Sequence, residues 1–256
     1  VATLIETLRI TNALRQSDAA VTRLTAGREH EAESKRVLAH ELTTPLASMR
    51  GLSQLLAGFD LTDAERRRVA SMLEAEAGKL QSLVGGLLDL ERLPLRDFQS
   101  SSTVIDLGDI VRMRANFLQA STDRPLIVTT VPNVFVRADP SLIERVIDNL
   151  VGNALKYAPP PSPVTISTRA EANSAVIEVE DRGSGLSEVE RERVFDRFFR
   201  GTSAAGTQGL GLGLSLVAEV AKWHGGNVLV ERAAAGGSVF RFTLPLAPAV
   251  AKAGAM

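Results

Sequence analysis

The chain has 256 residues, of which 45% are hydrophobic and 23% are charged, with a net charge of −1 at pH 7 and no cysteine. This composition is typical of a globular protein with two ordinary domains, and the near-zero charge gives no general attraction to nucleic acid or to an anionic membrane. The lack of cysteine excludes disulfides, thiolate nucleophiles and zinc–thiolate sites, and is consistent with a reducing compartment. No apolar run of about 18 residues predicts a membrane-spanning helix.

Residues 1 to about 92 are predicted to be almost entirely helical, with Pro45 as the single proline in that range. Residues 1–30 carry a weak heptad with Thr and Ser in its seam, so we expect a helical or coiled-coil linker there. From Leu38 onward, apolar residues recur every three or four positions, which predicts two helices separated by Gly58 and a Thr62–Glu65 capping box. Their seams comprise Leu38, Leu42, Pro45, Met49, Leu52 and Leu56, then Val69, Leu73, Glu76, Leu80, Leu83, Leu87 and Leu90.

Two antiparallel helices cannot hide their apolar stripes from water as an isolated pair. We therefore predict that residues 31–93 form a hairpin that pairs with a second copy into a four-helix bundle, which makes the protein a homodimer. An intramolecular bundle with residues 1–36 is the alternative, and it is less favoured because that segment has the weaker seam.

The sequence changes character after Leu93–Pro94. Residues 94–103 are expected to be a linker, residues 104–247 a second domain, and the Ala-rich residues 248–256 a disordered tail. In the second domain we expect strands at 126–131, 134–138, 164–169, 175–180, 227–231 and 238–244, and helices near 107–121, 140–157, 187–194 and 211–223. This mixture predicts an α/β sandwich with a mixed sheet, so the whole chain is of the α+β class.

The first candidate for chemistry is His40, which lies two residues after a seam position and is expected to point away from the bundle axis. Glu41 follows it directly, and Thr44 lies one turn further along the same face. Pro45 frees a backbone carbonyl and loosens the helix beside His40. An exposed imidazole held by a neighbouring carboxylate is a good nucleophile, although a solvated surface histidine is the plain alternative.

A polar stripe on the otherwise apolar helix 140–157 is the second candidate, formed by Asn149, Asn153, Lys156 and Tyr157. Asparagine carbonyls supply oxygen ligands that suit Mg²⁺, and Lys156 offers positive charge to phosphates. The alternative is a partly exposed helix with two incidental asparagines, but asparagine is a poor helix former and would need a reason to stand there.

Two glycine-rich segments complete the candidates. Asp181 follows a strand and could accept a hydrogen bond from an exocyclic amine such as that of adenine, while Gly183 and Gly185 let the backbone approach a ligand. The same pattern also marks ordinary turns. Residues Gly209–Gly213 open a helix and would present free N–H groups to phosphate. No strand precedes them, as a dinucleotide-binding loop would require, and the Gly-x-x-x-x-Gly-Lys-Ser/Thr phosphate loop is absent.

These blocks, in this order, resemble the histidine kinase family. The matching segments are His40–Leu46, Asn149–Tyr157, Asp181–Gly185, Phe195–Arg200 and Gly209–Gly213. Residues 223–226 and 237–245 also match the usual ending of the family, so the resemblance covers about residues 30 to 246. The resemblance implies a dimerisation and phosphotransfer hairpin followed by a Bergerat-type ATP-binding domain. It also implies ATP and Mg²⁺ as cofactors.

The resemblance assigns a role to each matching position. His40 is implied to be the phosphoacceptor, Glu41 the base that activates it, and Thr44 the residue that positions water in a phosphatase reaction. Asn153 is implied to bind Mg²⁺, and residues 201–209 to form a lid over ATP. The implied nucleotide contacts are Asn149, Asn153, Lys156, Tyr157, Asp181, Gly183, Gly185, Phe198, Arg200, Gly209, Leu210, Gly211, Leu212 and Gly213.

The implied function is autophosphorylation of His40, followed by transfer to an aspartate of a response-regulator protein. The start at Val1 favours a cytoplasmic fragment of a membrane-bound bacterial sensor, which would reach the membrane only through segments upstream of Val1. Thr43 departs from the family because a basic residue is usual there, and Pro159–Pro163 is unusually rich in proline. His30 and His224 lack the acidic and Thr-Pro neighbours, so they are expected to be structural.

Two rival functions stay open at this point. A Bergerat-type serine kinase or ATPase would lack the His-Glu-x-x-Thr-Pro hairpin that this chain has. A dimeric docking scaffold without activity would not need every catalytic position to be filled, as it is here.

Overall fold

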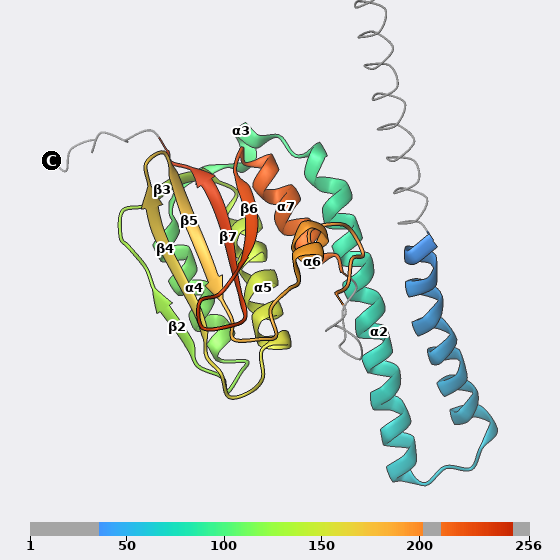
Figure 1. Ribbon diagram of the computed structural model, residues 1–256. Helices are drawn as coiled ribbons and strands as arrows, with labels where there is room; N and C mark the ends of the chain where they lie inside the picture. The colour runs from blue at the N-terminus through green and yellow to red at the C-terminus, as the bar shows by residue number, and fades with distance from the viewer. Residues whose placement is uncertain (1–35, 202–210, 248–256) are drawn as a thin grey trace, which may run out of the picture. The chain divides into compact units, whose positions relative to one another are not determined.

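The structure is a computed structural model that describes residues 36–201 and 211–247 (Figure 1). It contains two compact units that part between Leu80 and Gln81, within helix α2 (Asp63–Arg92). The predicted heptad of residues 1–30, His30, the lid loop 202–209 and the tail 248–256 lie outside the described residues. The division into domains at residues 93 and 103 stays a prediction. No helix in the described ranges is both long and apolar enough to cross a membrane.

The first unit is built from a helix over residues 36–58 and the first part of α2. The capping box before α2 is confirmed: the backbone N–H of Thr62 donates to a carboxylate oxygen of Glu65 at 2.9 Å, and the N–H of Glu65 faces the Thr62 hydroxyl at 3.4 Å. The predicted seams are confirmed as well, because every seam residue of both helices is buried or half-buried. Apolar spacing alone therefore identified the inner stripe of each helix.

The second unit contains a five-stranded sheet in the order β2 (Leu126–Thr129), β4 (Val164–Glu171), β5 (Ser174–Glu180), β7 (Ser238–Pro245), β6 (Asn227–Arg232). Strands β2 and β4 are parallel and the other pairs are antiparallel, so the predicted mixed sheet and the α+β class are confirmed. A separate two-stranded sheet pairs β1 (Thr103–Asp106) with β3 (Phe135–Ala138).

Besides the last part of α2, this unit contains the helices α4 (Leu107–Gln119), α5 (Pro140–Tyr157), α6 (Glu188–Arg193) and α7 (Gly213–Trp223). Short helices η1 (Leu93–Leu95) and α3 (Phe98–Ser101) precede β1. Helix α5 begins where Asp139 accepts a hydrogen bond from the N–H of Ser141 at 2.9 Å, with Pro140 in the first turn. This start and its end at Tyr157 agree with the sequence prediction.

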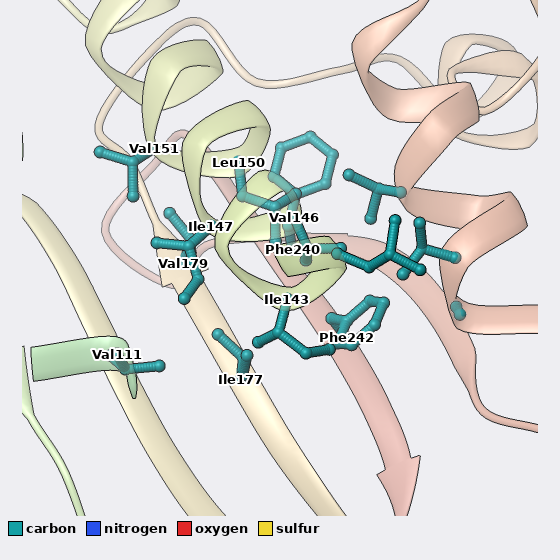
Figure 2. Packing of buried hydrophobic residues seen from close by; sticks show 14 of the residues in the cluster. Val111, Ile143, Val146, Ile147, Leu150, Val151, Ile177, Val179, Phe240 and Phe242 are labelled. Carbon is teal, nitrogen blue, oxygen red and sulfur yellow. The ribbon is translucent and has the colours of Figure 1, made fainter. Parts of the chain in front are cut away.

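One apolar core lies between the helices and the sheet. Figure 2 shows Ile143 and Ile147 of α5 turned toward the side chains of the central strands, among them Ile177. All three side chains are fully buried. Burial of such a side chain contributes about 1.5–3 kcal/mol, so the buried face of α5 fixes that helix on the sheet. The opposite face, which carries the polar stripe, is thereby held in one orientation.

Candidate functional site

His40 lies on the surface of its helix, with 75% of its side chain exposed. Its Nδ1 lies 3.6 Å from a carboxylate oxygen of Glu41, a side chain that is 27% exposed. This distance is longer than a hydrogen bond, so the two groups are neighbours that are not bonded to each other. The prediction that the ring points away from the helix seam is confirmed, and the imidazole is displayed to solvent beside a carboxylate that can orient it.

The two threonines after His40 both bond back to their own helix. The Thr43 hydroxyl donates to the Ala39 carbonyl at 2.7 Å, and the Thr44 hydroxyl donates to the His40 carbonyl at 3.0 Å. Both residues are exposed, whereas Pro45 is buried. Each hydroxyl keeps a free lone pair, so Thr44 can accept a further hydrogen bond one turn from His40.

The polar stripe of α5 extends from Asn149 to Tyr157. The Asn149 side-chain amide donates to the Arg145 carbonyl at 2.8 Å, which turns its own carbonyl oxygen toward the first residue of α7. A Cβ added at Gly213 would lie only 2.3 Å from that oxygen, so any larger residue at the start of α7 would have to displace the Asn149 side chain. The half-buried side chain of Asn153 makes no hydrogen bond with any described residue, which leaves its oxygen available to a ligand.

Lys156 and Tyr157 form the end of this stripe. The Lys156 ammonium donates to the Tyr157 hydroxyl at 2.8 Å and lies 4.5 Å from the centre of the same ring. Both side chains are half-buried. The positive charge of Lys156 is therefore held at the C-terminal end of α5, on the face that carries the asparagines.

Asp181 is 4% exposed and follows β5 directly. Its Oδ1 accepts hydrogen bonds from the N–H groups of Gly183 at 2.7 Å and Ser238 at 3.3 Å. Burial raises the pKa of this carboxyl, while the two N–H donors and the charge of Arg124 act in the opposite direction. A buried carboxylate with one oxygen bound by the backbone has the other available for a donor such as an exocyclic amine.

The glycines around Asp181 are required by close backbone contacts. A Cβ at Gly183 would lie 2.9 Å from the Tyr157 carbonyl oxygen, so the loop after Asp181 contacts the end of α5. Gly185 has a φ of +72°, a conformation that side chains disfavour. The structure thus brings the α5 stripe and the Asp181 loop together, although they are separate in the sequence.

Phe198 and the second glycine segment also meet. The N–H of Phe198 donates to the Gly211 carbonyl at 3.0 Å, and the two residues have φ values of +64° and +67°. A Cβ at Gly211 would lie 2.6 Å from the Phe199 carbonyl oxygen. Leu212 is buried and precedes α7, while Gly209 and Leu210 lie outside the described residues. The positive φ of Gly211 explains why α7 begins at residue 213 instead of the predicted 211.

Two residues that contact Asp181 were not among the predicted site residues. The backbone N–H of Ser238 bonds its carboxylate, and Gly237 has a φ of +97°, with a Cβ there only 2.1 Å from the Asp181 carbonyl oxygen. The glycine pair before β7 was the available signal, because paired glycines mark a turn of unusual conformation. The glycine pair indicated a turn but not a partner of Asp181, because Gly237 and Asp181 lie far apart in the sequence.

His224 is buried, with 5% exposure, and both of its ring nitrogens are bonded. Its Nδ1 lies 2.8 Å from the Val220 carbonyl, and its Nε2 accepts a hydrogen bond from the Asp139 N–H at 3.1 Å. Burial lowers the pKa of the ring. Phe98 of α3 packs edge-on against His224 and Trp223. This histidine joins the end of α7 to the start of α5, as expected of a structural residue.

Comparisons with known proteins match this arrangement in both units. Residues 36–95 match the family described as the His Kinase A (phospho-acceptor) domain. Residues 138–248 match the family described as Histidine kinase-, DNA gyrase B-, and HSP90-like ATPase. The Sensor-like histidine kinase SenX3 of Mycolicibacterium smegmatis is 35% identical over 217 residues, which are 82% of this chain and 56% of the relative. The chain therefore spans little more than half the length of that protein.

Two solved structures share the fold. Full-length ShkA in complex with AMPPNP has a TM-score of 0.61 and 26% identity, covering 84% of this chain and 46% of the other. The histidine kinase ThkA in complex with the response regulator protein TrrA has a TM-score of 0.66 and 21% identity, covering 84% of this chain and 62% of the other. The second likeness concerns the fold alone.

Proposed function

The chain belongs to the sensor histidine kinase family, with the phosphoacceptor and ATPase domains of that family, and on this premise we propose that it phosphorylates its own His40 from ATP. The observation that carries the proposal is the pairing of two kinds of site in one chain. One unit displays an exposed imidazole beside Glu41, and the other holds a buried Asp181 among glycines that contact the polar stripe of α5.

The ATPase unit supplies the groups that would hold the nucleotide. The free oxygen of Asp181 would accept a hydrogen bond from the adenine amine, and Lys156 would place its positive charge near the phosphates. The oxygen of Asn153 fits Mg²⁺, which prefers oxygen ligands and takes others from phosphate. When bound, Mg²⁺ would neutralise charge on the phosphates during transfer. Residues 201–209 would act as a lid that excludes water.

The hairpin unit supplies the nucleophile. A ring nitrogen of His40 would attack the γ-phosphorus with its lone pair, while the bond to the β,γ-bridging oxygen breaks and ADP leaves with that electron pair. Glu41 would orient the ring by accepting a hydrogen bond from the other nitrogen, and would then take its proton. The high exposure of His40 favours this role because the ring must be accessible to a nucleotide held by another domain.

We further propose that the phosphoryl group passes from His40 to an aspartate of a response-regulator protein. Family membership supports this step, and the ThkA structure contains such a partner. Thr44 would position water when the reaction is a phosphatase reaction on that partner. The two units would work in a homodimer whose hairpins form a four-helix bundle.

The test is incubation of the full chain with ATP labelled at the γ-phosphate and Mg²⁺. We expect label that survives base and is lost in acid, as a phosphohistidine requires. The chain contains three histidines, so His40→Gln should abolish labelling while His30→Gln, the matched control, should retain it. AMP-PNP binding should be unchanged in His40→Gln. Label that persists in His40→Gln would contradict the proposal.

A further inference from the structure

Arg124, in the loop between α4 and β2, binds two segments that lie far along the chain. Its Nη1 donates to the carbonyl oxygens of Leu155 at 2.6 Å and Ala158 at 3.0 Å. Its Nη2 and Nε donate to the Ser162 carbonyl at 2.7 Å and 3.1 Å, and Nη2 also faces the Ser162 hydroxyl at 3.2 Å. The side chain is partly buried. One guanidinium therefore joins the last turn of α5 to the proline-rich turn that follows it.

The contact supplies hydrogen-bond donors to carbonyl groups at the C-terminal end of α5. The last carbonyls of a helix have no partner within the helix, and a cation there is favoured by the helix dipole. Lys156 and Tyr157 stand between the two carbonyls that Arg124 binds, so the guanidinium fixes the turn from which both side chains project. The planar fork of arginine can serve several acceptors at once, whereas the single ammonium of lysine cannot reproduce that geometry.

The same contact accounts for the unusual turn of prolines 159–163. Prolines have no N–H, so this segment offers carbonyl acceptors with few donors of its own. Ser162 is the single residue of the turn that is not proline, and its N–H donates to the Pro159 carbonyl at 3.1 Å. Arg124 supplies the donors that the segment lacks. The turn is thereby held between the end of α5 and the start of β4 (Val164–Glu171).

The positive charge of Arg124 also acts to lower the pKa of Asp181, which burial raises. The Asp181 carboxyl is bonded by the backbone N–H groups of Gly183 and Ser238, and among the described residues Arg124 is the ionised group that favours its charged form. The loop after Asp181 in turn contacts the end of α5, because Gly183 lies against the Tyr157 carbonyl. Arg124 therefore affects both the end of α5 and the Asp181 carboxyl.

We propose that Arg124 is a positioning residue of the nucleotide site, which holds the C-terminal turn of α5 in register with the Asp181 loop. The inference rests on the proposed function, because it assumes that Asp181 and the α5 stripe bind ATP. We assign Arg124 no direct contact with the nucleotide, because its guanidinium is engaged with backbone carbonyls and Ser162. It acts through Lys156, Tyr157 and Asp181.

The test is calorimetric binding of AMP-PNP with Mg²⁺ to the full chain between pH 4 and pH 8. Arg124→Gln should weaken binding at neutral pH by about tenfold, because it removes hydrogen bonds to a charged donor that hold the site. It should also move the pH at which binding is half lost upward. Without the nearby positive charge Asp181 keeps its proton to a higher pH, and the protonated carboxyl is a poorer acceptor for the adenine amine.

Arg124→Lys separates anchoring from charge. It should keep the wild-type pH midpoint, because the charge remains, and still bind more weakly than wild type, because the fork is lost. If Arg124 had only a structural role, the Lys and Gln variants would not differ in their pH midpoints. Arg112→Gln is the matched control: it removes an exposed arginine of α4 that bonds Asp109 and Thr130, and it should change neither quantity.

The outcomes are distinct. If wild type binds AMP-PNP and both Arg124 variants bind with the same affinity and pH midpoint, the inference is overturned while the proposed function stands. If wild type does not bind at any pH, the proposed function fails and this inference fails with it. If Arg124→Gln does not fold, Arg124→Lys decides: weaker binding at the wild-type midpoint supports positioning, and unchanged binding overturns it.

Discussion

The two units of this chain bury their apolar residues to very different extents. The ATPase unit has a continuous core in which residues such as Ile147, Ile177 and Phe242 are fully buried. Within residues 36–80 of the hairpin unit, only Pro45 and Leu52 are buried. Large apolar side chains there stay exposed, at 52% for Leu46 and 65% for Phe59. The ATPase unit also exposes apolar side chains, such as Phe117 at 63%, but it has a buried core of its own. Residues 36–80 of a single hairpin have almost no buried core.

The difference follows from the geometry of the elements. A sheet with helices on one face can bury a whole layer of side chains, so the ATPase unit closes its own core. Two helices contact each other along one narrow stripe and leave the flanking apolar positions in water. An exposed apolar surface of this kind usually marks an interface, which supports the proposal that a second copy completes the hairpin.

The largest effect expected from this comparison is in the ATPase core. Ile177→Ala should lower the free energy of unfolding by about 2–5 kcal/mol, through lost burial and the cavity left behind. Denaturant unfolding followed by the fluorescence of the single tryptophan, Trp223, measures this unit. The control is Ile127→Ala, on edge strand β2, whose side chain is 48% exposed; it should change stability by less than about 0.5 kcal/mol. Equal losses at both positions would contradict the core described here.

The next largest effect concerns the hairpin. Leu55 is 41% exposed beside the seam residues Leu52 and Leu56, so in a single copy its substitution should be nearly neutral. In a four-helix bundle, Leu55→Glu should weaken dimerisation by roughly ten- to hundredfold, because it places a charge in an apolar interface. Analytical ultracentrifugation measures the dissociation constant, and the Trp223 unfolding transition should stay unchanged. Wild-type chain that sediments as a monomer at every concentration would remove the proposed dimer.

A smaller effect separates binding from stability within the ATPase unit. Asp181→Asn should weaken AMP-PNP binding by about tenfold, because the carboxylate oxygen that accepts from adenine is replaced. The same variant should be more stable than wild type at pH 7. Burial raises the pKa of Asp181 above its ordinary value of 3.8, so the folded state loses stability as pH rises from about 4 and the carboxyl ionises. Calorimetric titration measures the affinity for AMP-PNP, and thermal unfolding at pH 4 and pH 7 measures the stability.

In that experiment the stability gain of Asp181→Asn should shrink as the pH falls, because the wild-type carboxyl gains its proton and no longer carries a buried charge. Glu178→Gln is a useful contrast, because Arg169 and Arg241 lower the pKa of Glu178 despite its partial burial. Removing that charge should destabilise the protein at pH 7. If the two variants changed stability in the same direction, the opposite environments assigned to the two carboxyls would be wrong.

Local patterns in the sequence predicted what depends on neighbours along the chain. The hairpin seams follow from spacing, and the bounds of α5 follow from Asp139–Pro140 at its start and the prolines after Ala158. Strand β1 was missed because it pairs with β3, which lies beyond α4 in the sequence. The roles of Gly237 and Arg124 were missed for the same reason, because their partners Asp181 and Leu155 lie elsewhere in the sequence. Periodicity carries no information about such contacts.

The smallest expected effect is the pH dependence that His224 gives to the ATPase unit. Its Nε2 accepts the Asp139 N–H and its Nδ1 faces the Val220 carbonyl, so the folded protein needs the neutral ring. Burial lowers the pKa of His224 below its ordinary value of 6.5, so its contribution is fully present above pH 6.5 and is lost as the pH falls toward the lowered pKa. Wild-type stability, followed by Trp223 fluorescence, should therefore decrease on acidification below about pH 6.5.

His224→Gln should be less stable at pH 7 but should lack this slope, because an amide does not titrate. The same slope in both proteins would assign the acid sensitivity to another group.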